Sequence, residues 1–251
     1  MLVSVQAQES EHHITLLAVS DKGDSYEGSI ADLFLKVGEG SGRIFIDSHP
    51  LTKIDTQISN RFAKEIVCEQ FGRDCEHYDF FYTIRANSVI VGGPSAGAAS
   101  ALLTLAALDD QKINESVAIT GTINSGGLIG PVGGILKKIE AAAEEGITTV
   151  LIPEGERFVD EEGVVSDAIE YGVELGVDVR EVSDIYEAAK YVFNVEYPRK
   201  TEEPEIDISY AETMTVLADG ICTRTGRLSK GIDNLENTSS ILSSKPIIFS
   251  A

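Results

Sequence analysis

Hydrophobic and polar positions follow two periods along this chain, one typical of strands and one typical of helices. Short stretches rich in β-branched and aromatic residues predict strands. Stretches with apolar residues three or four positions apart predict helices. The expected strands cover residues 12–19, 29–37, 43–47, 79–84, 116–121, 148–153 and 177–182. The expected helices cover residues 56–71, 96–108, 134–145, 167–175 and 184–193. Because strands and helices alternate in the second half of the chain, we expect an α/β core.

Two local patterns add detail to this outline. The glycine-rich stretch 38–42 separates two expected strands, which predicts a hairpin turn between them. In the expected helix 56–71, the apolar side chains of Ile58, Phe62, Ile66 and Val67 fall on one side, and Gly72 ends the helix.

The chain divides by composition into a main domain with an appendage. A proline-rich and charged stretch at 198–204 is typical of a linker, and 208–227 predicts an amphipathic helix interrupted at Gly220. The expected parts are an N-terminal tail (1–10), one globular domain (11–195) and a C-terminal linker, helix and tail (196–251).

The two ends leave the location of the protein open. Val5-Gln6-Ala7 has the small-x-small pattern that follows the apolar part of an export signal, although a frayed cytosolic start fits equally. The apolar stretch 246–249 either leads toward a membrane segment or docks on the body. The sequence thus describes a soluble chain, or the extracytoplasmic part of a longer exported or membrane-anchored chain.

The net charge and the positions of cysteine and histidine exclude some classes of partner and ligand. The formal net charge of −21 argues against nucleic acid as a partner. No cysteine has the spacing of zinc ligands, and the adjacent His12 and His13 point to opposite faces of a strand, so we expect no metal. Cys68 and Cys75 form a disulfide if the chain folds back after Gly72, and are otherwise buried thiols.

The stretch Gly92-Gly93-Pro94-Ser95-Ala96-Gly97 carries the first candidate chemistry. It joins an expected strand to an expected helix, so the hydroxyl of Ser95 lies near unpaired helix N–H groups. Such groups hold an anion, including the oxyanion of acyl transfer. The alternative is that Ser95 is an ordinary helix N-cap.

A second stretch, Gly130-Pro131-Val132-Gly133-Gly134-Ile135-Leu136-Lys137-Lys138, follows the first at a defined spacing. Together the two resemble the Gly-Pro-Ser-Ala-Gly and Pro-x-Gly-Gly…Lys motifs of the Lon protease family, in which the lysine lies 43 residues after the serine, as Lys138 does after Ser95. The resemblance covers residues 14–193. It implies an α/β (α+β) domain like the Lon proteolytic domain, which is related to the ribosomal protein S5 domain 2-like fold.

The resemblance also implies a mechanism. Ser95 and Lys138 form a Ser-Lys catalytic dyad, Thr120 supports the lysine, and Gly93, Pro94 and Ala96 form the oxyanion loop. Many Lon proteases have an acidic residue immediately before Gly-Pro-Ser, whereas this chain has Gly93.

The helical pattern selects the same lysine independently of the resemblance. On a helical wheel of 134–145, Lys138 lies at the margin of the apolar side, beside Ala141 and Ala142. Lys137 lies nearly opposite, among Glu140 and Glu144, where it is solvated and paired. A partly buried lysine has its charged form disfavoured, as a general base near neutral pH requires.

These observations predict an ATP-independent serine endopeptidase that acts on unfolded polypeptides or peptides and needs no cofactor. The sequence contains no Gly-x4-Gly-Lys-Ser/Thr motif, so the ATP-dependent role of full Lon proteases does not carry over. The resemblance further implies a homo-oligomer, with a hexamer as one size. The alternatives are a small-molecule kinase with a phosphate loop at 92–100, and a catalytically silent binding module of the same fold.

Overall fold

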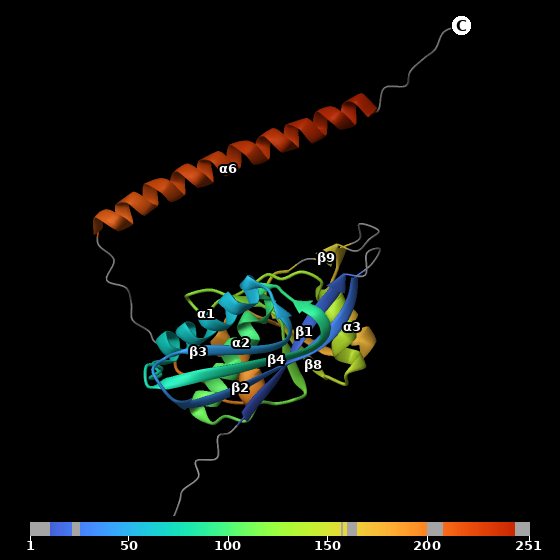
Figure 1. Ribbon diagram of the computed structural model, residues 1–251. Helices are drawn as coiled ribbons and strands as arrows, with labels where there is room; N and C mark the ends of the chain where they lie inside the picture. The colour runs from blue at the N-terminus through green and yellow to red at the C-terminus, as the bar shows by residue number, and fades with distance from the viewer. Residues whose placement is uncertain (1–10, 22–25, 157, 160–164, 200–207, 244–251) are drawn as a thin grey trace, which may run out of the picture. The chain divides into compact units, whose positions relative to one another are not determined.

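The structure is a computed structural model that describes residues 11–21, 26–156, 158–159, 165–199 and 208–243. The chain forms two compact units, Met1–Lys200 and Thr201–Ala251. The first unit contains a seven-stranded mixed sheet with helices packed against it (Figure 1). In sheet order the strands are β11 (Asp178–Val182), β8 (Thr149–Pro153), β5 (Val117–Ile119), β1 (Glu11–Asp21), β2 (Tyr26–Glu39), β4 (Tyr78–Val91) and β3 (Ile44–Thr52).

The sheet changes direction at β1. Strands β11, β8, β5 and β1 run parallel, whereas β1 pairs antiparallel with β2, and β2 antiparallel with β4. Two short pairs complete the strands: β6 (Thr122–Ile123) with β7 (Ile129–Gly130), and β9 (Phe158–Val159) with β10 (Val165–Ser166). The α/β fold class that the sequence predicts is confirmed.

Helices cover both faces of the sheet because alternate strand residues are apolar on either side. Leu16, Ile119 and Leu151 belong to a core that includes residues of three helices, α1 (Ile54–Phe71), α2 (Gly97–Asp109) and α5 (Ile185–Phe193). Their neighbours Leu17, Ala118 and Val150 belong to a second core that includes residues of α3 (Ile135–Glu144) and α4 (Ala168–Leu175). The short helix η1 (Pro94–Ala96) immediately precedes α2.

The expected hairpin at 38–42 is wrong. Strand β4 lies between β2 and β3, and it pairs antiparallel with β2 and parallel with β3. Asp79 of β4 explains the placement, because its Oδ1 accepts hydrogen bonds from the backbone N–H groups of Ser41 and Arg43, at 2.8 and 2.9 Å. The glycine-rich turn therefore carries the chain across the end of β4 instead of folding β3 directly onto β2.

Helix α1 is also packed differently from its expected orientation. Ile66 and Val67 are buried, but Ile58 and Phe62 are 56% and 38% exposed. Buried polar side chains take part of the inner face: the hydroxyl of Ser100 on α2 donates to Asn60 Oδ1 at 2.6 Å. A simple apolar stripe therefore misses how this helix contacts α2.

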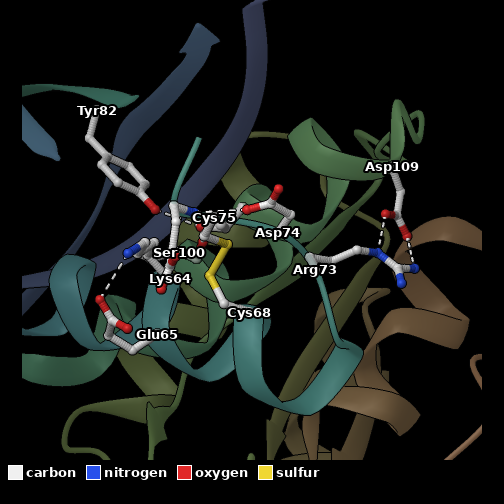
Figure 2. Close-up of a disulfide and its surroundings, with 11 residues drawn as sticks. Lys64, Glu65, Cys68, Arg73, Asp74, Cys75, Tyr82, Ser100 and Asp109 are labelled. Atoms are coloured by element: carbon white, nitrogen blue, oxygen red, sulfur yellow. Dashed lines mark hydrogen bonds and ion pairs between the residues drawn. A yellow bond between two sulfur atoms is a disulfide. The ribbon is translucent and has the colours of Figure 1, made fainter. Parts of the chain in front are cut away.

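The segment after α1 answers the question that the sequence left open for Cys68 and Cys75. Helix α1 ends at Gly72, which adopts the left-handed conformation (φ 63°), so the chain folds back and Cys75 meets Cys68 in a disulfide (Figure 2). Arg73 secures the fold-back: its guanidinium donates to both carboxylate oxygens of Asp109, at 2.5 and 2.7 Å. Cys222 is exposed and free.

The described residues of the second unit form the helix α6 (Ile208–Ser243). The helix runs without a break through Gly220, so the expected interruption there is wrong, because a single glycine weakens a helix without ending it. Among the described residues, no helix combines the length and hydropathy needed to cross a bilayer. Both terminal patterns, at 5–7 and 246–249, lie outside the described residues.

Loss of the disulfide is expected to destabilise the protein. The bridge closes a loop with a sequence separation of seven, and a loop of this size stabilises a fold by about 2–3 kcal/mol through the lost freedom of the unfolded chain. We expect the double variant Cys68→Ala/Cys75→Ala to lose this amount in urea unfolding. The matched control Cys222→Ala should unfold at the midpoint of the unmodified protein. Equal midpoints for all three proteins would contradict a stabilising disulfide.

Candidate active site

Ser95 lies on the tight connection between β4 and α2. Strand β4 ends at Val91, η1 follows at Pro94–Ala96, and α2 begins at Gly97. Gly93 has φ 109° and ψ 147°, a conformation that residues with a side chain rarely adopt. An acidic residue immediately before Pro94 would therefore be strained in this chain, which explains why glycine stands there.

The alternative that Ser95 is an ordinary N-cap is wrong. The capping positions are Gly93 for η1 and Ala96 for α2, and neither helix has a side-chain cap hydrogen bond. Ser95 lies inside the single turn of η1 and is partly buried. Its hydroxyl is thus not needed to begin the helix.

Backbone hydrogen bonds tie Ser95 to the segment that follows β5. The N–H of Gly121 donates to the carbonyl oxygen of Ser95 at 3.0 Å, and the N–H of Ala98 donates to the carbonyl oxygen of Gly121 at 3.1 Å. Gly121 also packs closely against Ile129, because a Cβ at Gly121 would lie 2.4 Å from a side-chain carbon of Ile129. Thr120 precedes Gly121, so it lies one residue away from the backbone hydrogen bond between Gly121 and Ser95.

Lys138 reaches the same place from the other face of the sheet. It lies in the first turn of α3, whose N-cap, Gly134, is left-handed (φ 71°) and packs against Val19. The side chain is 2% exposed, and Nζ donates to Thr120 Oγ1 at 2.9 Å. The inward orientation that the helical wheel predicts for Lys138 is confirmed, and so is its predicted contact with Thr120.

Lys137 differs from Lys138 in burial and in partner. Its side chain is about half exposed, and Nζ pairs with Glu140 on the same helix at 2.9 Å. Tyr171 on α4 also donates to Glu140. Lys137 thus pairs on the outer side of α3, whereas Lys138 is the lysine of this pair that contacts Thr120.

The environment of Lys138 favours its neutral form. Burial lowers the pKa of the amine to about 8, and the nearby carboxyl of Glu156 acts in the opposite direction, raising it. A lysine that is half neutral near pH 8 can accept a proton from a hydroxyl at physiological pH, whereas an ordinary lysine remains almost fully charged there.

Glu156 is the residue that sequence reasoning missed. It follows β8, and its Oε1 accepts a hydrogen bond from the N–H of Val132 at 2.6 Å. Val132 lies three residues before α3, the helix that carries Lys138. Glu156 therefore contacts the chain just before this helix, from the segment that follows β8. Nothing in the stretch Glu154-Gly155-Glu156 distinguishes this carboxyl from a solvated one, and only the three-dimensional contact identifies it.

A small apolar groove adjoins the serine loop. Its volume is about 240 Å³, and it is lined by Asp55, Ile58, Ser59, Phe62, Pro94, Thr122 and Ile123. The outward orientation of Ile58 and Phe62 on α1, which the sequence pattern did not predict, supplies much of its apolar wall. Pro94, the residue before Ser95, is the part of the serine loop that lines this groove. Among the described residues, no group of three or more His, Cys, Asp or Glu side chains is arranged to hold a metal ion.

The fold is an α/β domain in which a buried lysine binds a threonine, and the next residue, Gly121, binds the backbone of a turn-borne serine. Residues 56–191 match the family model described as the Lon protease (S16) C-terminal proteolytic domain. The chain therefore belongs to this family of proteolytic domains.

Individual relatives agree with the family match. An archaeal Lon protease from Methanothermobacter thermautotrophicus is 39% identical over 88 residues, which cover 35% of this chain and 14% of that protein. A Lon protease from Paraburkholderia phytofirmans is 37% identical over 119 residues, or 45% of this chain and 15% of that protein. An archaeal Lon protease from Halobacterium salinarum is 26% identical over 162 residues, or 64% and 22%. The chain thus matches less than a quarter of the length of each of these relatives.

The depressed pKa of Lys138 is directly measurable. In an NMR titration with lysine labelled at Cε, the Lys138 signal, assigned through the Lys138→Arg variant, should titrate with a midpoint near pH 8. Burial is the physical reason, since it disfavours the ammonium form. A midpoint at the ordinary value of 10.5 would contradict the burial of the amine.

Proposed function

We propose that this chain is a Lon-like serine endopeptidase that hydrolyses peptide bonds with a Ser95–Lys138 dyad and without ATP. The observation that carries the proposal is the buried Lys138, with a pKa of about 8 and a hydrogen bond to Thr120 beside the serine loop. Membership in the family of Lon proteolytic domains supports the proposal.

The proposed reaction has two stages. Neutral Lys138 takes the proton of the Ser95 hydroxyl while Oγ forms a bond to the peptide carbonyl carbon. The resulting ammonium gives this proton to the leaving amine as the C–N bond breaks, which leaves an acyl-serine. A water molecule then hydrolyses the acyl-serine with the same lysine as base. Thr120 orients the lysine in both stages.

The serine loop is proposed to stabilise the oxyanion. The loop of Gly93, Pro94 and Ala96 lies at the start of α2, where backbone N–H groups and the helix dipole favour negative charge. Pro94 has no N–H, so its part is to fix the shape of the turn.

The groove beside Pro94 suggests which substrates fit. Ile58, Phe62 and Ile123 give it an apolar wall, and it is large enough for one side chain of a peptide. We therefore propose unfolded polypeptides or peptides as substrates, cleaved next to an apolar residue. The disulfide further supports work in an oxidising location, as expected for the extracytoplasmic part of an exported or membrane-anchored protein.

Cleavage of casein without ATP tests the dyad. Ser95→Ala and Lys138→Ala should each lower the rate by about 1,000-fold or more, and the double variant should be little worse, because the two residues act as one unit. Activity of the unmodified protein should rise with pH through about 8, because the neutral lysine is the base.

Lys137→Ala is the matched control for the lysine. It removes only an exposed ion pair, and such pairs contribute little, so the rate should remain within about two-fold of the unmodified protein. The dyad is contradicted if Lys137→Ala abolishes cleavage while Lys138→Ala preserves it.

We also propose that copies of the chain associate through α6, in a homo-oligomer for which a hexamer is one size. Met214, Ile221 and Leu228 recur every seven residues, Tyr210 and Leu217 lie four residues before Met214 and Ile221, and all five are exposed. A heptad of exposed apolar residues along a helix is typical of association between helices.

Sedimentation at micromolar concentration tests this association. The unmodified protein should sediment as a species larger than the monomer. The variant Ile221→Glu should shift it toward the monomer, because it places a charge in the apolar stripe. Thr223→Glu, an equivalent change outside the stripe, should have no such effect. If the unmodified protein sediments as a monomer, the proposed association is wrong.

A further inference from the structure

Glu156 is bound by only one of its two carboxylate oxygens. Oε1 accepts the N–H of Val132 at 2.6 Å. Oε2 is shielded from solvent and has no hydrogen-bond partner within the described part of the chain. Burying a carboxylate oxygen without a hydrogen-bond partner costs free energy. A residue that only held Val132 would need one acceptor oxygen and not a second, buried and unpaired one. The second oxygen therefore calls for an explanation.

The neighbourhood of Glu156 supplies one. Its hydrogen bond to Val132 fixes the segment that leads into α3 and Lys138. The two charged groups act on each other: Glu156 raises the pKa of Lys138, and Lys138 lowers that of Glu156, although burial leaves the pKa of the carboxyl above its ordinary value. A carboxylate at this place also lies near the N-terminal end of α3, where the helix dipole favours negative charge.

Two other charged groups of α3, Lys137 and Glu140, pair with each other. Glu140 on the same helix is bonded to Lys137 and to Tyr171 of α4. The remaining elements packed against α3 are β1, β2 and β8. Among the described residues, Glu156 is the charged group whose interaction shifts Lys138.

We propose that Glu156 is a positioning residue of the Ser95–Lys138 site, which holds the start of the lysine helix through Oε1 and stabilises the Lys138 ammonium through its negative charge. This inference rests on the proposed function. The ammonium forms when Ser95 gives its proton to Lys138. Oε2 then provides an acceptor for an N–H of the ammonium, directly or through one water molecule.

The same inference explains Gly93. A carboxylate placed immediately before Pro94 would need a side chain at φ 109°, where L residues are strained. Glu156 supplies the negative charge from the segment after β8 instead, without a side chain at that strained position. The site therefore has its carboxylate in a different part of the sequence from the many Lon proteases that have it before Gly-Pro-Ser.

The variant Glu156→Gln tests the charge separately from the hydrogen bond, because the amide oxygen still accepts from Val132. With the negative charge removed, the lysine loses a proton more readily. The acidic limb of the pH profile of kcat/KM should then move to lower pH, by about half a pH unit or more. Glu154→Gln is the matched control: Glu154 is exposed and two residues away, so its profile should coincide with that of the unmodified protein.

Glu156→Ala tests the hydrogen bond. This variant removes both the charge and the contact with Val132, so kcat should fall at every pH, whereas Glu156→Gln should retain most of the activity at its optimum. Equal profiles for Glu156→Gln and the unmodified protein would overturn the proposal, as would equal activities of Glu156→Gln and Glu156→Ala.

A measurement without turnover separates this inference from the proposed function. The NMR titration midpoint of Lys138 should be lower in Glu156→Gln than in the unmodified protein and unchanged in Glu154→Gln. If Ser95→Ala cleaves casein normally, the proposed function fails, and the titration still decides whether Glu156 acts on Lys138. If the dyad variants behave as expected and the Lys138 midpoint does not move, only the role of Glu156 fails.

Discussion

The burial of one amine determines how this domain is arranged. An ammonium group away from water is unfavourable, so a lysine that is 2% exposed requires a compact environment that nevertheless offers a hydrogen-bond acceptor. Thr120 provides the acceptor and Glu156 a nearby charge. Gly134 allows α3 to begin close to Val19. The position of this helix start determines where Lys138 lies in the first turn. A stability-driven core would place an apolar side chain here, so the lysine is best explained by chemistry.

The serine loop and the lysine helix are connected to opposite faces of the sheet. The helix that follows Ser95 belongs to the core on one face, and α3 with Lys138 belongs to the core on the other. Thr120, just beyond the carboxyl end of β5, binds Lys138, and the next residue, Gly121, binds the backbone of Ser95. This point lies next to β1, where the parallel part of the sheet meets the antiparallel part.

Local sequence patterns predicted the structure correctly where one physical effect dominated. The helical wheel selected Lys138 over Lys137 because α3 is strongly amphipathic, and strand composition gave most of the sheet. The same patterns gave wrong predictions where contacts between residues distant in the chain determine the structure. Asp79 places β4 between β2 and β3, and polar contacts with α2 rotate the apolar side chains of Ile58 and Phe62 outward. Glu156 could not be found from sequence, because its role depends on a contact with Val132, which lies 24 residues away in the chain.

The most direct test is covalent labelling of the nucleophile. The unmodified protein and Lys138→Ala would be treated at pH 8 with a serine-directed acylating probe, and the modified peptide identified by mass spectrometry. A Ser95 hydroxyl activated by a neutral lysine should give a single adduct on Ser95 in the unmodified protein and almost none in Lys138→Ala. An adduct on a different residue, or equal labelling of Ser95 in both proteins, would contradict the Ser95–Lys138 dyad.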